Sequence, residues 1–357
     1  MGRMTGTRGG RGALLRRAAA TCMAVSAIAL AGCSAAPEVV VTAPAPEVVA
    51  DGLEAPWSLA PFGEEMLVSE RDSARVLEIS ASGEVREVGV IGGVSHGGEG
   101  GLLGLAIREG ELYSYSTGAD GNRVERRPLV GEAGALSLGD PVTVIDGIPS
   151  AGTHNGGRIA FGPDGMLYVT TGDAGDRQSA QDVEALSGKI LRLEPDGSIP
   201  ADNPFAGSPV FSYGHRNPQG IGWDRDGAMY ASEFGQDTWD ELNVIVAGGN
   251  YGWPVVEGIA DDARYIDPVQ QWTPEEASPS GIAVTGSDIL VANLRGERVR
   301  IVPLDDLGTS TEMFVGEYGR IRDIAVTVGA TWYLTNNTDG RGDPRSGDDR
   351  LILLGMD

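Results

Sequence analysis

The chain has few cysteines and few aromatic residues, and these shortages limit its fold class. Its two cysteines, Cys22 and Cys33, both lie near the N-terminus, so a disulfide framework in the rest of the chain is excluded. Aromatic residues make up 6% of the 357 residues, and long helical periodicity is absent. With 54 glycines, this composition favours many short strands joined by tight turns.

Positive charge is also scarce. The formal net charge is −24, and the first 32 residues hold five arginines and no acid. The remaining chain therefore has 22 basic and 51 acidic residues, or 22 − 51 = −29. Such a surface repels phosphate backbones, so nucleic acid is not expected as a partner. The many aspartates could instead supply oxygen ligands for calcium, or keep a secreted domain soluble.

Several common enzyme motifs are missing. No GxSxG elbow, P-loop or strand-linked GxGxxG segment stands out in the sequence. This argues against a serine hydrolase, a nucleoside triphosphatase and a nicotinamide-dependent enzyme.

The N-terminus has the pattern of an export signal. An arginine-rich segment over residues 1–17 precedes a short run of small apolar residues over 18–32, which is too short for a comfortable membrane span. The run ends in Leu30-Ala31-Gly32-Cys33, which resembles the bacterial lipobox, in which the cysteine is lipidated. We therefore expect a lipoprotein signal peptide over 1–32 and a lipidated Cys33. The alternative is a plain secretory signal with an accidental cysteine.

The next segment is expected to be a tether. Residues 33–48 are rich in alanine and proline, which is typical of a semi-extended linker. The folded domain is then expected over residues 49–357. These features predict an extracytoplasmic bacterial lipoprotein that is lipid-anchored to the cell membrane.

One strand–loop–strand pattern recurs six times after the tether. A glycine or polar turn leads into a short apolar strand, and a polar loop leads to a second strand. The paired strands are expected at 65–69 and 75–79, 111–115 and 123–126, 165–170 and 189–193, 227–231 and 241–245, 287–291 and 298–301, and 331–335 and 350–353. Six similar hairpins predict an all-β, six-bladed β-propeller, and a β-sandwich does not explain them.

The three histidines all lie in loops between these copies. His96, His154 and His215 are each embedded in glycine-rich or polar sequence. A loop histidine is most often an ordinary surface residue, but histidine beside arginine and asparagine can supply a base and fixed donors together. A propeller would bring such loops to one mouth of its central channel.

Two further patterns leave alternatives open. Arg320 and Arg322 would share one face of a strand, where acidic neighbours or a polycarboxylate ligand could satisfy them equally well. The acidic loops over 235–241 and at 261–262 could form a calcium cage, although solvated loops are favoured on this pattern alone.

Two segments together identify a resemblance to a known family. GHRNPQG at 214–220 and GGNYGWP at 248–254 occur in the order found in the soluble glucose/sorbosone dehydrogenases. These are PQQ-dependent aldose sugar dehydrogenases with six-bladed propellers, and the resemblance covers about residues 55–350. It implies oxidation of aldose sugars to lactones with PQQ and calcium, and electron transfer to a membrane-associated acceptor.

The resemblance also implies roles for individual residues. His154 matches the general base, and Arg216 matches the cation beside the reacting quinone carbonyl. The implied cofactor-binding residues are Asn217, Gln219, Arg295, Arg320 and Arg322. Those on the sugar side are Glu99, Asp173 and Trp272. The carbonyls of Gly235 and Gln236 match the catalytic calcium site, and a second calcium site is implied at Glu241, Tyr251, Glu257 and Asp261.

Three positions depart from the family pattern. Phe234 stands where a polar cofactor contact is expected, Gln236 replaces a proline, and Thr153 replaces an aspartate. Two other functions are therefore kept as alternatives. One is a calcium-dependent lactonase-type hydrolase, although a neutral lactone needs no arginine cluster. The other is a non-catalytic extracytoplasmic binding propeller, for which Phe234 is the main support.

Overall fold

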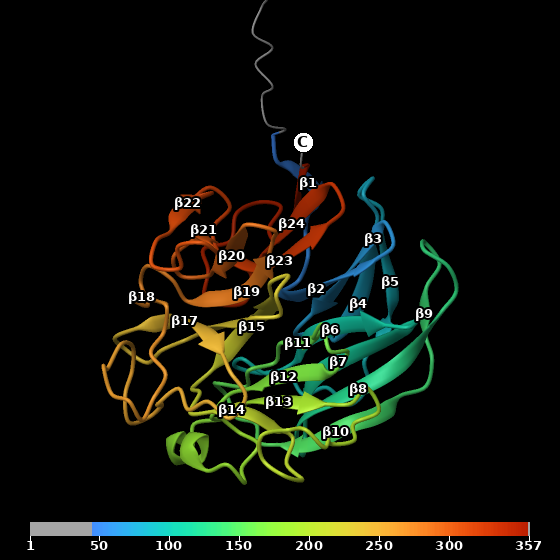
Figure 1. Cartoon of the computed structure of the whole chain (residues 1–357). Helices are drawn as coiled ribbons and strands as arrows, with labels where there is room; N and C mark the ends of the chain where they lie inside the picture. The colour runs from blue at the N-terminus through green and yellow to red at the C-terminus, as the bar shows by residue number, and fades with distance from the viewer. Residues whose placement is uncertain (1–44, 356–357) are drawn as a thin grey trace, which may run out of the picture. The chain divides into compact units, whose positions relative to one another are not determined.

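The fold is built from six antiparallel sheets. The computed structural model describes residues 45–355, which form twenty-five strands and one short 3-10 helix. The predicted signal peptide, Cys33 and most of the predicted tether lie outside these residues. The six sheets stand around a common axis (Figure 1), and the predicted six-bladed propeller is confirmed. No helix within residues 45–355 is long and apolar enough to cross a membrane.

The first three blades follow one another along the chain. The first consists of β2 (Pro56–Phe62), β3 (Glu65–Glu70), β4 (Arg75–Ile79) and β5 (Val85–Val90). The second consists of β6 (Leu102–Arg108), β7 (Glu111–Gly118), β8 (Gly121–Val130) and β10 (Val142–Ile148), with β9 (Ser137–Leu138) paired to β8. The third consists of β11 (Ile159–Phe161), β12 (Leu167–Thr171), β13 (Lys189–Leu193) and β14 (Val210–Tyr213), and η1 (Arg177–Gln181) lies between β12 and β13.

The last three blades complete the ring. The fourth consists of β15 (Pro218–Trp223), β16 (Met229–Glu233), β17 (Asp240–Ile245) and β18 (Gln270–Trp272). The fifth consists of β19 (Pro279–Val284), β20 (Asp288–Asn293), β21 (Arg298–Pro303) and β22 (Thr311–Met313). The sixth consists of β23 (Ile321–Thr327), β24 (Ala330–Thr335), β25 (Leu351–Gly355) and the N-terminal β1 (Glu47–Ala50).

The sixth blade joins the two ends of the domain. β1 pairs antiparallel with β25, with Glu47 opposite Leu353. This pairing completes the sixth blade with a strand from the start of the domain and so closes the ring. Because β1 begins at Glu47, the last two residues of the predicted tether belong to the sheet.

The core lies between neighbouring blades. For example, Leu67 and Val76 of the first blade pack against Leu102, Leu105 and Leu112 of the second. Each sheet alternates its side chains between two faces, so each blade can bury a face only against the next. The six predicted hairpins are confirmed as the second and third strands of the six blades.

Candidate functional site

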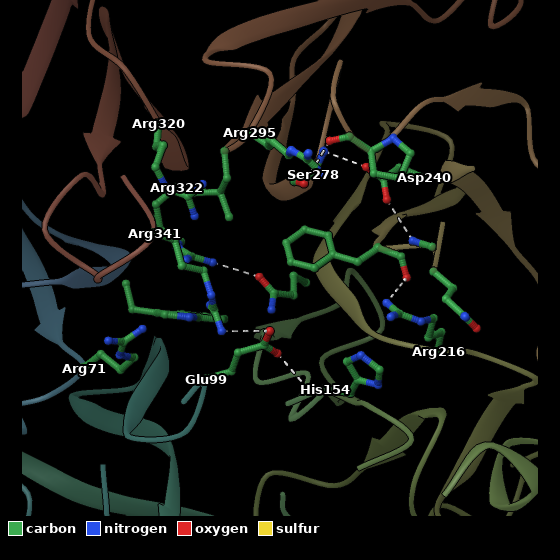
Figure 2. Close-up of a pocket in the computed structure, with 17 residues that line it drawn as sticks. Arg71, Glu99, His154, Arg216, Asp240, Ser278, Arg295, Arg320, Arg322 and Arg341 are labelled. Carbon is green, nitrogen blue, oxygen red and sulfur yellow. Dashed lines mark hydrogen bonds and ion pairs between the residues drawn. The ribbon is translucent and has the colours of Figure 1, made fainter. Parts of the chain in front are cut away.

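A cavity lies where loops from the six blades converge (Figure 2). It has a volume of about 400 Å³. The first strand of each blade starts at this end, the second strand ends here, the third starts here and the fourth ends here. The loops between blades and the loops between second and third strands therefore meet at this mouth. These are the loops in which the sequence places the histidines and the glycine-rich segments.

Nine of the predicted site residues line this cavity. They are Glu99, His154, Arg216, Gln219, Gly235, Gln236, Arg295, Arg320 and Arg322. Phe234 lines it as well, so the departure from the family pattern falls within the site. Segments more than 200 residues apart in sequence are thus brought to one wall.

His154 is held by a buried carboxylate. Its Nδ1 lies 2.7 Å from Oδ1 of Asp173, whose side chain is fully buried. Burial opposes ionisation of Asp173, but hydrogen bonds from His154 and from the Gly175 amide outweigh it and lower the pKa of Asp173. An ionised carboxylate can only accept, so Nδ1–H of His154 donates to it. The neutral ring then keeps an unprotonated Nε2, which is the atom that a general base needs.

The backbone of His154 is fixed by a second acid. His154 has φ +58°, a left-handed conformation that is uncommon for residues other than glycine. Its amide donates to Oε2 of Glu99 at 2.7 Å, and Oε1 of Glu99 lies 3.2 Å from Nη2 of Arg341. Figure 2 shows Glu99 between His154 and Arg341. The strained backbone therefore has a specific partner, and Glu99 lies beside the candidate base.

Six arginines line the cavity, although the protein as a whole is strongly acidic. They are Arg71, Arg216, Arg295, Arg320, Arg322 and Arg341. The carboxylates on the same wall are Glu99 and Asp240, and burial raises the pKa of Asp240 to about 6. The wall thus carries an excess of positive charge and is suited to a ligand with several negative charges.

Arg322 is the most deeply buried of these arginines. Its guanidinium donates to Oε1 of Gln219 at 2.9 Å and to Oδ1 of Asn336 at 2.8 Å, and it lies 3.5 Å from Asp339. Asp339 also pairs with Arg320 at 3.2 Å. Burial lowers the pKa of Arg322 to about 9, because one buried carboxylate does not compensate for the clustered cations.

Arg216 has a similar deficit of partners. Burial lowers the pKa of its guanidinium, whose Nη1 donates to the carbonyl of Phe234 at 3.2 Å. Its buried Nε has no hydrogen-bond partner among the described residues. The guanidinium carbon lies 5.5 Å from the ring centre of Trp253, and Trp253 Nε1–H donates to Asp173 at 2.8 Å. Arg216 and the His154–Asp173 pair are therefore held by one framework.

A second, much smaller cavity adjoins the first. Its volume is about 10 Å³, and Glu233, Glu241, Tyr251 and Glu257 are among its lining residues. Burial raises the pKa of Glu241, and the charge of Glu233 raises it further. Within residues 45–355, no three His, Cys, Asp or Glu side chains already converge as a metal centre. The carboxylates of this cluster repel one another, and a cation bound by their oxygen atoms could stabilise them.

The positions of Asp173, Trp272 and Asp261 in the structure correct three of the predicted assignments. Asp173 does not face a substrate, because its carboxylate is buried behind His154. Trp272 belongs to the core beside the fifth blade. Asn217 is fully buried, and its Oδ1 accepts a hydrogen bond from the Gly156 amide at 2.9 Å. Its Nδ2 has no hydrogen-bond partner among the described residues, so the cofactor contact of Asn217 stays a prediction. Asp261 is exposed and lies away from the small cavity, where Glu233 is found instead.

The sequence interpretation also missed several residues on the cavity wall. They include Trp57, Arg71, Asp240 and Arg341. Arg71 directly follows β3, and Arg341 lies in the loop after β24. Both follow the second strand of a blade, as Gly235 does, so aligning the six repeats would have indicated them.

Comparisons with known proteins identify the family of the chain. Residues 53–351 match the family model described as Glucose / Sorbosone dehydrogenase. A PQQ-bound aldose sugar dehydrogenase from Streptomyces coelicolor is 47% identical, with a TM-score of 0.83, over 88% of this chain and 99% of that one. Quinoprotein glucose dehydrogenase B from Acinetobacter calcoaceticus is 35% identical over 56% of this chain and 50% of its own length.

A further relative is Aldose sugar dehydrogenase YliI from Escherichia coli K12. It is 34% identical over 58% of this chain and 61% of its own length. This chain therefore spans about half to three fifths of these two curated relatives, whereas the family match covers nearly all of residues 45–355. The expected resemblance is confirmed: the chain belongs to the glucose/sorbosone dehydrogenase family.

Proposed function

We propose that this protein is a PQQ-dependent dehydrogenase that oxidises aldose sugars to lactones. The observation that carries the proposal is the wall of six arginines facing a cavity of about 400 Å³, with His154 on the same wall and Asp173 bonded behind it. Cavities of this size accommodate cofactors. The arginine excess, the lowered pKa values of Arg216, Arg320 and Arg322, and the unpaired Nε of Arg216 all favour an anionic, acceptor-rich group such as a quinone tricarboxylate.

The chain's own residues have separable tasks in this reaction. Arg320 and Arg322 would hold carboxylates of PQQ, and Arg216 would face its reacting carbonyl. Bound PQQ supplies the two-electron acceptor that the side chains lack. Nε2 of His154 would accept the proton of the anomeric hydroxyl, while Asp173 stabilises the charged ring and fixes its orientation through Nδ1–H. Glu99 would lie on the sugar side.

Calcium is proposed as the second cofactor. The carbonyls of Gly235 and Gln236 are candidates for a catalytic ion, which would polarise a carbonyl as a Lewis acid. The small cavity beside Glu233, Glu241 and Glu257 is the candidate for a structural ion. The support is the repulsion between buried carboxylates at that cavity.

The structural calcium site leads to a stability prediction. Adding calcium to chelator-treated protein is expected to raise Tm by about 5 °C at about a hundred times the Kd. Glu241→Gln is expected to abolish that rise without lowering Tm in chelator, because it removes one of the repelling charges. Differential scanning calorimetry checks both values, with Glu87→Gln on the outer strand β5 as a control that keeps the rise. An undiminished rise in Glu241→Gln would contradict the site.

The N-terminal sequence, which ends its apolar run at Cys33, supports a proposed location outside the cytoplasm. A lipidated Cys33 would anchor the domain outside the cytoplasmic membrane, close to a membrane-associated electron acceptor. Mass spectrometry of the protein purified from membranes is expected to show a diacylglyceryl mass on Cys33. A signal peptide cleaved at another residue, with no lipid, would overturn the anchor.

The test of the proposed activity is dye reduction by the PQQ-loaded protein across a panel of aldoses and matched alditols. We expect calcium-dependent reduction with aldoses, with lactone as the product. Lactone hydrolysis without dye reduction would instead support the hydrolase alternative.

A further inference from the structure

Lys189 is the only lysine in the chain. The other 26 of the 27 basic residues are arginine. Lys189 begins β13 in the third blade, and its side chain is fully buried. It does not line the cavity and is not part of the proposed reaction. A buried cation outside the site is costly and needs a physical explanation.

The ammonium group is held by backbone carbonyls. Nζ donates to the carbonyls of Ser179 at 2.7 Å, Ala180 at 3.1 Å and Ser187 at 2.7 Å. It forms no ion pair with any acid among residues 45–355. Burial lowers the pKa of Lys189 to about 8, and the charge of Asp182 opposes that shift. Three carbonyls around one compact cation resemble the coordination of a metal ion more than a salt bridge.

These carbonyls belong to the loop that carries Asp173. The loop runs from Asp173 to Gly188 and connects β12 to β13. Its start is fixed by Asp173 N–H, which donates to the carbonyl of Arg216 at 2.8 Å. Its middle is fixed by Lys189 and by Gly214 N–H, which donates to the carbonyl of Ala180 at 2.8 Å. The ammonium therefore lies where the Asp173 loop meets the loop of Arg216.

The choice of lysine follows from this geometry. An ammonium directs three donors from one small centre, whereas a guanidinium is planar, larger and spreads its donors. In a chain that uses arginine at its other 26 basic positions, the single lysine lies where three buried backbone carbonyls converge on its Nζ.

We propose that Lys189 is a positioning residue for the reaction: its buried ammonium fixes the loop 173–188 and thereby holds Asp173 against His154 and in register with Arg216. The catalytic part of this inference rests on the proposed function. The structural part, that the ammonium maintains the His154–Asp173 hydrogen bond, does not depend on it.

The first test is the kinetics of Lys189→Met, which keeps the volume of the side chain and removes its charge. We expect kcat to fall about tenfold to a hundredfold, with sugar KM and PQQ Kd changing less than about threefold. Arg192→Met is the matched control, because it removes a buried cation from the same strand that pairs with Asp164 and Asp202 instead of the loop. We expect Arg192→Met to keep kcat. An unchanged kcat in Lys189→Met overturns the proposal.

The second test uses the cofactor-free protein and no activity. With one lysine, ¹⁵N-lysine labelling gives one Nζ signal, which we expect to show slow hydrogen exchange in the wild type. The low-field proton of His154 Nδ1–H, assigned with His154→Ala, is expected to disappear or broaden in Lys189→Met and to persist in Arg192→Met. A fast-exchanging Nζ in wild type overturns the proposal even if Lys189→Met does not fold.

Chemical rescue separates charge from volume. Lys189→Ala with added n-propylammonium is expected to regain the His154 signal, whereas n-propanol of similar size is not. Rescue by both compounds would assign Lys189 a space-filling role and overturn the proposal. Absence of dye reduction in the wild-type protein would contradict the proposed function. The Nζ exchange rate and the His154 Nδ1–H signal would still decide whether the ammonium maintains the His154–Asp173 hydrogen bond.

Discussion

Replacing His154 by alanine is expected to lower kcat about a thousandfold while PQQ binding stays nearly unchanged. The reason is that Nε2 of His154 is the proposed acceptor of the substrate proton, and general-base catalysis contributes on this scale. The arginines proposed to bind the cofactor do not depend on the imidazole for their hydrogen bonds; Arg322, for example, is held by Gln219 and Asn336. The variant therefore separates proton transfer from cofactor binding.

The measurement is steady-state dye reduction with saturating PQQ, together with calorimetric titration of PQQ. His96→Ala is the matched control, because His96 is exposed, lies in another loop and does not line the cavity. We expect wild-type kcat in that control. Turnover above about a tenth of the wild-type rate in His154→Ala would refute the assignment of the base.

Arg322→Leu is expected to weaken PQQ binding about a hundredfold, or about 2.7 kcal/mol. Arg322 is fully buried and its pKa is lowered by burial to about 9, so its charge is poorly compensated until an anion binds. The same argument predicts that the cofactor-free variant melts close to the wild type. Removing this charge relieves repulsion from neighbouring arginines, which offsets the lost hydrogen bonds to Gln219 and Asn336.

Titration calorimetry measures the affinity, and scanning calorimetry measures Tm without cofactor. Arg300→Leu is the control, because Arg300 is also buried but lies on β21 beside Glu312, outside the cavity. We expect Arg300→Leu to bind PQQ as the wild type does. Equal affinities in Arg322→Leu and wild type would show that the arginine wall serves the fold and not the cofactor.

The fold could be predicted because its signal is repetitive. Each blade contributes one apolar hairpin, and the six hairpins match the second and third strands, such as β3 with β4 and β24 with β25. The innermost strands carry a weaker pattern. β15 begins with Pro218 and contains Gly220 and Gly222, and at Gly220 a side chain would collide with the backbone carbonyl of Ser280. Alternation alone does not identify such strands.

The sequence identifies a site residue where a local motif contains it. It does not identify the direction of a side chain that is set by contacts within the fold. His154 and Arg216 follow from local sequence. Asp173 was placed on the sugar side because its loop neighbours the site, but the carboxylate turns inward to bond His154 and Trp253. The direction of such a side chain depends on tertiary contacts, which the spacing of residues in the sequence does not predict.

The most direct test of the central claim is titration of the cofactor-free protein with PQQ, with and without calcium, followed by dye reduction on an aldose panel. The account predicts micromolar or tighter binding that strengthens with calcium, and reduction that requires both PQQ and an aldose. No binding at micromolar PQQ would contradict it. That result would indicate that Phe234, which replaces an expected polar contact, prevents cofactor binding. It would favour a propeller that binds ligands without catalysis.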